Sequence, residues 1–168
     1  MKNKFITAVI AAGFVASAGM AFAETIKVGY ITTLSGGAGI IGKQMKNAVE
    51  LAMEHKGGKL GGMDAEVIFV DDQRKPDVTK QLANKLLKSE KVDVIGGIIW
   101  SNLLMAIHKQ VTRADTLLIS SNAGPSPVAG SNCHKNFFSM SWQNDQTPEA
   151  MPRCHFLRIT TSLHAILY

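Results

Sequence analysis

The chain has 168 residues, of which 46% are hydrophobic and 18% are charged, and this composition suits a packed domain and excludes a disordered or collagen-like chain. Four bases at the two ends supply most of the formal net charge of +5: Lys2, Lys4, Arg153 and Arg158. The middle of the chain is close to neutral and has no basic block, so we expect no nucleic acid partner.

The first 23 residues predict a secretory signal peptide. Lys2 and Lys4 precede an apolar run over 5–15, which is shorter than the roughly 20 residues needed to cross a bilayer. Small residues flank Phe22 at the end of the segment, and we expect cleavage after Ala23. The sequence therefore predicts a soluble protein that is exported to the periplasm and starts near Glu24.

Strand and helix patterns alternate along the mature chain. In chain order they predict a strand over 26–33, a helix from Ile41, a strand over 65–70, a helix from Pro76, a strand over 92–99, a helix capped by Ser101 or Asn102, a strand over 116–120 and an edge strand over 137–140. This order predicts the α/β class, with an open parallel sheet and helices on both faces.

Helical spacing also predicts which faces of the helices are buried. The first helix presents Ile41, Met45, Ala48, Val49, Ala52 and Met53, and the third presents Leu103, Leu104, Ile107 and Val111. In open parallel sheets, ligands bind beyond the carboxyl ends of the strands. The loops expected to form a site are therefore 34–41, 71–76, 99–102 and 121–131.

The loop after the first strand matches a nucleotide-binding motif. Gly37, Gly39 and Gly42 have the spacing of the dinucleotide fingerprint, and Asp71 closes the next strand. In a true fingerprint the first glycine lies at the strand end, whereas here three residues intervene, and an exported protein meets no nicotinamide pool. We expect no cofactor, and an exported α/β enzyme that uses Gly37–Gly42 for a nucleotide or phosphate is the alternative function.

Catalytic and metal-binding patterns are missing from the sequence. No serine lies in a Gly-x-Ser-x-Gly turn, and no Cys-x-x-Cys or histidine pair has metal-ligand spacing. The acidic pair Asp71-Asp72 is more typical of a strand end than of catalysis. We therefore expect neither an enzyme nor a metal site.

Candidate binding residues lie at the start of the third predicted helix and in the loop after the fourth strand. A helix N-terminus offers unpaired N–H groups that suit a carboxylate, so Ser101 and Asn102 are either ligand donors or an ordinary cap. The loop residues Asn122, Ala123, Gly124 and Ser126 either add donors to the same crevice or form a plain surface loop. Trp100 is either a pocket wall or a core residue.

Four segments occur in an order that resembles the Leu/Ile/Val-binding family of periplasmic solute-binding proteins: VGYITTLSGGAGIIGKQMKNAVELA, VIFVDDQRKPDVTKQLANKLL, VDVIGG and LLISSNAGPSPVAG. The similarity runs over 26–151. The resemblance implies a type I periplasmic-binding-protein lobe in a receptor that serves an ABC importer. Such a receptor is a monomer whose two lobes close on a small solute, and its partner is an ABC permease.

The resemblance also implies where the ligand binds. Its carboxylate is expected at the Ser101 region and at the Asn122-Ala123-Gly124 loop. Ile41 falls where the family often places an aromatic wall residue, so its aliphatic side chain leaves open whether the solute is a branched-chain amino acid or an aromatic or other organic acid.

Three regions are expected along the chain: a signal peptide over 1–23, a partial first lobe over 24–151 and an atypical tail over 152–168. The tail lacks Asp, Glu, Gly and Lys, and we interpret it as out-of-frame or misjoined sequence. The family crosses into its second lobe around 139–144, so we expect a truncated copy with impaired binding. An exported sensory domain is a third reading, but it would be followed by a membrane span, and this sequence shows none.

Overall fold

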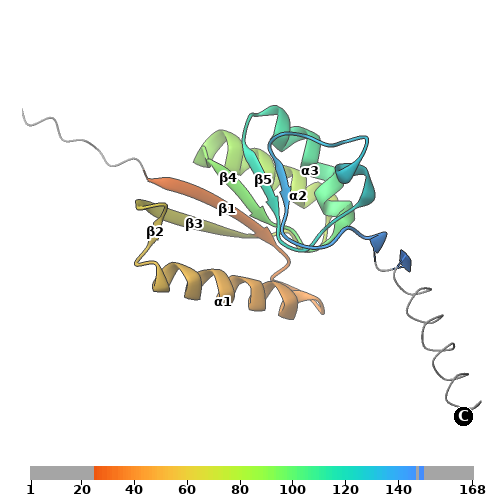
Figure 1. Cartoon of the computed structure of the whole chain (residues 1–168). Coiled ribbons are helices and arrows are strands. Elements are labelled where there is room, and N and C mark those ends of the chain that lie inside the picture. The colour runs from red at the N-terminus through yellow and green to blue at the C-terminus, as the bar shows by residue number, and fades with distance from the viewer. Residues whose placement is uncertain (1–24, 147, 150–168) are drawn as a thin grey trace, which may run out of the picture.

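A six-stranded sheet forms the centre of the fold (Figure 1). The computed structural model describes residues 25–146 and 148–149, so the predicted signal peptide and tail lie outside the described residues. The strands are β1 (Ile26–Thr32), β2 (Lys59–Leu60), β3 (Met63–Asp71), β4 (Val94–Gly97), β5 (Leu117–Ser120) and β6 (Phe137–Ser139). They lie in the order β2-β3-β1-β4-β5-β6.

All neighbouring strands are parallel except β2 and β3. These two form a short hairpin through Gly61 and Gly62, whose φ angles of 58° and 87° lie in the left-handed region that glycine adopts without strain. The sequence pattern predicted the four inner strands and the edge strand β6, but it did not predict β2. Two residues are too few to show a period.

Helices cover both faces of the sheet, as the sequence predicted (Figure 1). Helix α1 (Gly39–His55) lies on one face, and α2 (Pro76–Lys85) and α3 (Ser101–Arg113) lie on the other. A π turn over Leu86–Glu90 extends α2, and a 3-10 turn covers Ser126–Ala129. In the described part of the chain, no helix is both long and apolar enough to cross a membrane.

The main hydrophobic core lies between the sheet and the helices α2 and α3. The predicted buried face of α3 is confirmed, since none of its four apolar residues is exposed to solvent: Leu103, Leu104, Ile107 and Val111. Ile68 and Val70 of β3 pack against this core. Because side chains alternate along a strand, Val67 and Phe69 point to the opposite face, toward α1.

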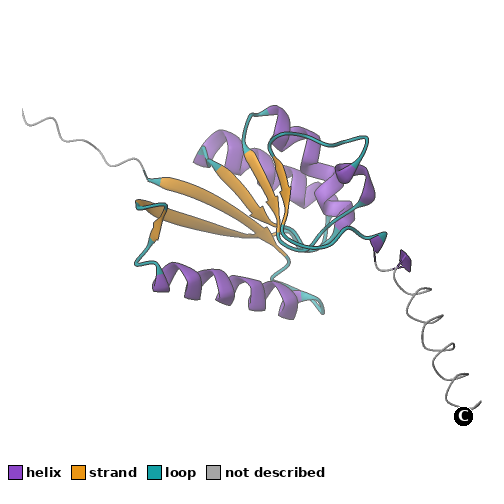
Figure 2. Ribbon diagram, viewed as in Figure 1, coloured by secondary structure: helices purple, strands orange, loops and turns teal. Residues whose placement is uncertain are grey.

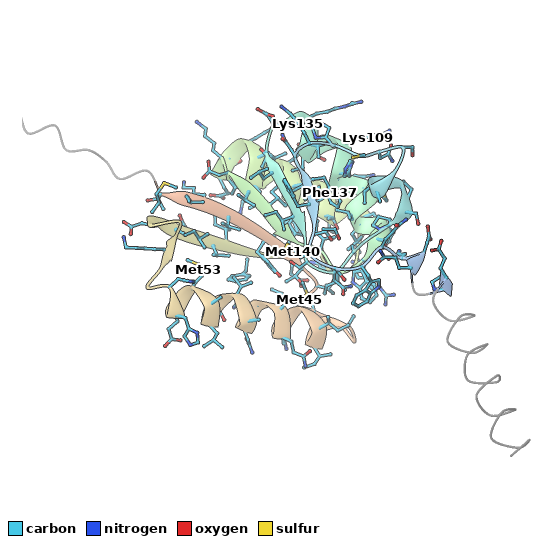
Figure 3. The ribbon with its side chains drawn as sticks, viewed as in Figure 1. Met45, Met53, Lys109, Lys135, Phe137 and Met140 are labelled. Atoms are coloured by element: carbon cyan, nitrogen blue, oxygen red, sulfur yellow. The ribbon has the colours of Figure 1, made fainter. Side chains whose placement is uncertain are left out.

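Helix α1 packs less closely against its face of the sheet. Met45, Val49 and Met53 are half-buried, and Figure 3 shows the two methionines on the side of the helix that faces the sheet. The other members of the predicted face are exposed, namely Ile41, Ala48 and Ala52. The prediction for this helix was therefore correct for only one stripe of residues. A hollow of about 450 Å³ remains between α1 and β3.

Two glycines bring the start of α1 against the end of β1. Gly39 and Gly42 are the buried residues of this helix. A methyl group at Gly42 would overlap the carbonyl oxygen of Thr33, and one at Gly39 would press on the carbonyl of Leu34. Two glycines of the fingerprint-like motif thus serve close packing between helix and strand, while Gly37 faces open space.

Candidate ligand-binding site

The carboxyl ends of β1, β3, β4 and β5 meet at one edge of the sheet, because these strands are parallel and adjacent. The loops that follow them gather at this edge (Figure 2). This is the edge at which open α/β sheets bind their ligands.

Asp72 connects three of these loops from a fully buried position. Its Oδ1 accepts hydrogen bonds from the Thr33 hydroxyl at 2.6 Å and from the backbone N–H of Arg74 at 2.8 Å. The same Thr33 hydroxyl accepts the indole N–H of Trp100 at 2.9 Å. The carboxylate therefore fixes the Trp100 ring through Thr33 and the turn at Arg74 directly.

Asp71 binds the neighbouring backbone in the same way. Its Oδ1 accepts from the N–H of Leu34 at 2.8 Å and of Gln73 at 2.9 Å. Partial burial acts to raise the pKa of Asp71, but hydrogen bonds from Ser35, Leu34 and Gln73 outweigh it and lower the pKa. The ionised carboxylate joins the β1 and β3 exits, which agrees with the strand-end role expected for this acidic pair.

Arg74 lies over Trp100, with its guanidinium carbon 4.0 Å from the centre of the ring. Its φ of 58°, like that of 52° at Gln73, is left-handed, and the bond from its N–H to Asp72 holds this turn. Within the described residues its guanidinium forms no ion pair. Sequence analysis placed Arg74 in a candidate loop but did not single it out, because its contact with Trp100 is not local.

A hollow of about 490 Å³ opens at the β1 exit beside this pair. Its lining consists of Thr33, Ser35, Gly36, Gly37, Ala38, Ile41, Gln73 and Arg74. Ile41, which was predicted as a wall residue, is 40% exposed here and contributes an aliphatic surface. Arg74 supplies the charge in this lining.

Helix α3 begins one residue earlier than its predicted cap implies. Trp100, not Ser101 or Asn102, occupies the N-cap position, so the cap expected of those two residues is wrong. The N–H groups of Leu103 and Leu104 bond to the Trp100 carbonyl. Those of Ser101 and Asn102 have no acceptor within the helix, since the first N–H groups of any helix lack one.

The loop after β5 is fastened to the β4 exit. Ser121 and Ala123 donate their backbone N–H groups to Gly97 and Ile98, and the Asn122 side chain donates to the Ile99 carbonyl at 2.9 Å. Two of the predicted donors, Asn122 Nδ2 and Ala123 N–H, thus already bond within the protein. Ser126 starts the 3-10 turn and is half-buried.

Asn144, which sequence analysis did not single out, links the two predicted halves of the site. Its side-chain Nδ2 donates to the Ser101 hydroxyl at 3.0 Å, and its backbone N–H donates to the Gly124 carbonyl at 2.8 Å. Gly124 is itself buried, and a methyl group there would overlap the carbonyl oxygen of Trp142. Asn144 therefore links Ser101 to Gly124, while Asn102 next to Ser101 is exposed.

The described residues contain no group of three or more histidine, cysteine or acidic side chains that could hold a metal ion. What the edge offers is N–H and O–H donors, one guanidinium, an indole and an aliphatic wall. Groups of these kinds commonly line small-molecule sites, where a few polar groups fix the orientation of the ligand.

Comparison with known proteins identifies the family. The model of the periplasmic binding protein family matches residues 25–153. The chain belongs to this family. The resemblance seen in the sequence and the predicted lobe architecture are thereby confirmed. Membership implies an extracytoplasmic location, and the similar proteins are substrate-binding proteins of transport systems.

Several members of the family are similar to this chain in detail. The Leu/Ile/Val-binding protein homolog 6 of Brucella abortus is 30% identical over 129 residues, which cover 76% of this chain and 33% of that protein. A solute-binding protein of an ABC transporter from R. palustris, solved with benzoate, is 33% identical with a TM-score of 0.70, covering 73% of this chain and 34% of that one.

Another such protein, from Rhodopseudomonas palustris BisB5 and solved with 3,4-dihydroxybenzoic acid, is 34% identical with a TM-score of 0.65. It is matched over 71% of this chain and 32% of its own. The chain thus spans about a third of the length of the relatives it matches.

Proposed function

We propose that this chain forms the first ligand-binding lobe of a periplasmic receptor, which delivers a small carboxylate-bearing solute to an ABC permease. The observation that carries the proposal is the position of Asn144, which bonds both Ser101 and Gly124 at the carboxyl edge of the sheet. The start of α3 and the loop after β5 are thereby held beside each other at the place where such sheets bind ligands.

The start of α3 suits a carboxylate group. The N–H groups of Ser101 and Asn102 lack helical acceptors, and the positive end of the helix dipole favours an anion. The Ser101 hydroxyl oxygen accepts from Asn144, so its own hydrogen is free to donate to a ligand oxygen. Three donors in this arrangement can hold one carboxylate.

The solute is a branched-chain amino acid or a related organic acid, including aromatic acids. Trp100 and Ile41 are the walls in this proposal: Ile41 lines the hollow, and Trp100 packs against the core and bonds to Thr33 of the same lining. The relatives support both classes, since one is named for Leu/Ile/Val binding and two were solved with aromatic acids.

Recognition without catalysis is the function that this edge supports. The Oδ1 atoms of Asp71 and Asp72 accept hydrogen bonds from backbone N–H groups and from the Thr33 hydroxyl, and the lining of the hollow contains no histidine, cysteine or lysine. The packing of Gly39 and Gly42 against β1 explains the fingerprint-like spacing without a nucleotide. We infer that the receptor acts as a monomer, exported by the signal peptide over 1–23, and that the described lobe binds only weakly by itself.

The experiment is an amide-resolved NMR titration of the mature chain with benzoate and with leucine at millimolar concentrations. We expect the amides of Ser101 and Asn102 to shift, and Ser101→Ala to weaken binding severalfold. Ser89→Ala is the matched control, because Ser89 is exposed and precedes β4, at the opposite edge of the sheet. Shifts confined to other regions, or an equal effect of both variants, would contradict the proposal.

A further inference from the structure

We propose that Arg74 makes this lobe select acids that lack an ammonium group over zwitterionic amino acids. The inference rests on the proposed function and specifies its ligand class. Its basis is an exposed guanidinium that stacks on Trp100 at the wall of the ligand hollow and forms no ion pair among the described residues.

The position of Arg74 is defined by two contacts that do not depend on a ligand. Its guanidinium stacks on the Trp100 ring at 4.0 Å, and its backbone N–H bonds to Asp72. Trp100 is in turn fixed because its indole N–H donates to the Thr33 hydroxyl, and that hydroxyl donates to Asp72. A cation arranged in this way loses little side-chain entropy when a ligand arrives.

The hollow and the start of α3 are adjacent. Trp100 directly precedes Ser101, and its indole bonds to Thr33, which lines the hollow. An acid whose carboxylate is held at Ser101 is thus placed next to Trp100, the residue on whose ring the guanidinium stacks. In a leucine-type ligand, the ammonium group is carried by the carbon next to the carboxylate.

No anion in the lining compensates the charge of Arg74. Among the described residues that line the hollow, Arg74 is the one with a charged side chain. Neither Asp71 nor Asp72 is among the residues that line the hollow, and neither forms an ion pair with Arg74. An ammonium group placed here meets a like charge, whereas a second anionic or neutral group does not.

The test compares leucine with isocaproate, which has the same carbon skeleton without the ammonium group. Both are titrated by NMR into the mature chain, and we expect isocaproate to bind about tenfold more tightly at low salt. Arg74→Met removes the charge and should bring the two affinities within about twofold. Raising the salt concentration should also narrow the preference in the unmodified chain.

Lys75→Met is the matched control, because it removes the same charge from the next residue, which does not line the hollow. The preference should survive in this variant and in Arg74→Lys. Equal affinities for the two ligands in the unmodified chain, or equal losses in Arg74→Met and Lys75→Met, would overturn the inference. If neither ligand shifts the Ser101 and Asn102 amides, the proposed function fails as well, so the two failures can be told apart.

Discussion

The indole N–H of Trp100 donates to the hydroxyl of Thr33 at 2.9 Å and joins the start of α3 to the end of β1. The bond crosses 67 positions of the chain and lies at the edge where the ligand is proposed to bind. Since the Thr33 hydroxyl donates a hydrogen bond to Asp72, which also accepts the N–H of Arg74, one buried carboxylate organises three loops that are distant in sequence.

Trp100→Phe keeps an aromatic ring under Arg74 but removes the donor to Thr33. We expect the free energy of unfolding to fall by about 1 kcal/mol, because one partly buried hydrogen bond is lost. Urea denaturation followed by circular dichroism measures the change. Trp142→Phe, at an indole that is 60% exposed, should leave the midpoint unchanged, and an equal loss in both variants would contradict the prediction.

Gly42→Ala should destabilise the fold by about 1–3 kcal/mol, because the added methyl group would overlap the Thr33 carbonyl and push α1 away from β1. Gly37→Ala is a control within the same motif, since nothing lies within 4 Å of a methyl group there. Thermal and urea unfolding of the two variants measure the contrast. A stable Gly42→Ala protein would show that the helix start yields more easily than the structure indicates.

We expect the free energy of unfolding to fall in mild acid because of His108. Burial, followed by the nearby charges of His134 and Lys109, lowers the pKa of His108, and its ring nitrogens have no hydrogen-bond partner among the described residues. Its ring packs edge-on against Phe137 at 5.3 Å. The folded chain therefore resists taking up a proton that the unfolded chain binds at the usual pKa.

The direction of the pH dependence follows from this difference in the pKa of His108 between the folded and the unfolded chain. Above about pH 6.5 both states are neutral at this residue, and as the pH falls below that value the unfolded state gains the proton first, so stability decreases by at most about 1.4 kcal/mol per pH unit. His108→Leu should flatten the pH dependence of the urea midpoint between neutrality and the carboxylate range. His55→Gln, at the exposed end of α1, should preserve it.

Binding by the 168-residue chain itself should be weaker than micromolar. The described lobe offers the ligand one open edge, so the ligand remains partly solvated and lacks contacts that a closing partner lobe would add. Isothermal titration calorimetry of the mature chain with leucine, isocaproate and benzoate tests this. A dissociation constant of micromolar or tighter, about 8 kcal/mol of binding free energy, would contradict it.

Much of the fold could be predicted because it depends on local periodicity. The four-residue stripe of α3 and the apolar run of β4 follow directly from side-chain spacing, and both are buried as expected. The exposed half of the predicted α1 face shows the limit of this reasoning. Spacing shows which residues share a face, but it does not show how closely the sheet approaches that face.

The site was less predictable because its contacts are not local. Ser101 looked like a helix cap, yet the extended backbone of Trp100 takes that position and leaves the Ser101 hydroxyl to Asn144. Arg74 and Asn144 lie in loops whose sequence shows no pattern. Only the folded chain places the first over Trp100 and the second between Ser101 and Gly124.

The glycine spacing at the start of α1 bears on how such motifs are searched for. Gly37 completes the nucleotide-type motif although a methyl group there would meet nothing within 4 Å, whereas Gly39 and Gly42 are required by the close approach of helix and strand. A search for the dinucleotide motif would therefore miss a variant with alanine at position 37, although that change is expected to leave the fold intact. The same search would match a protein that binds no nucleotide. Close packing between a helix and a strand can therefore produce the same glycine spacing as a cofactor-binding motif.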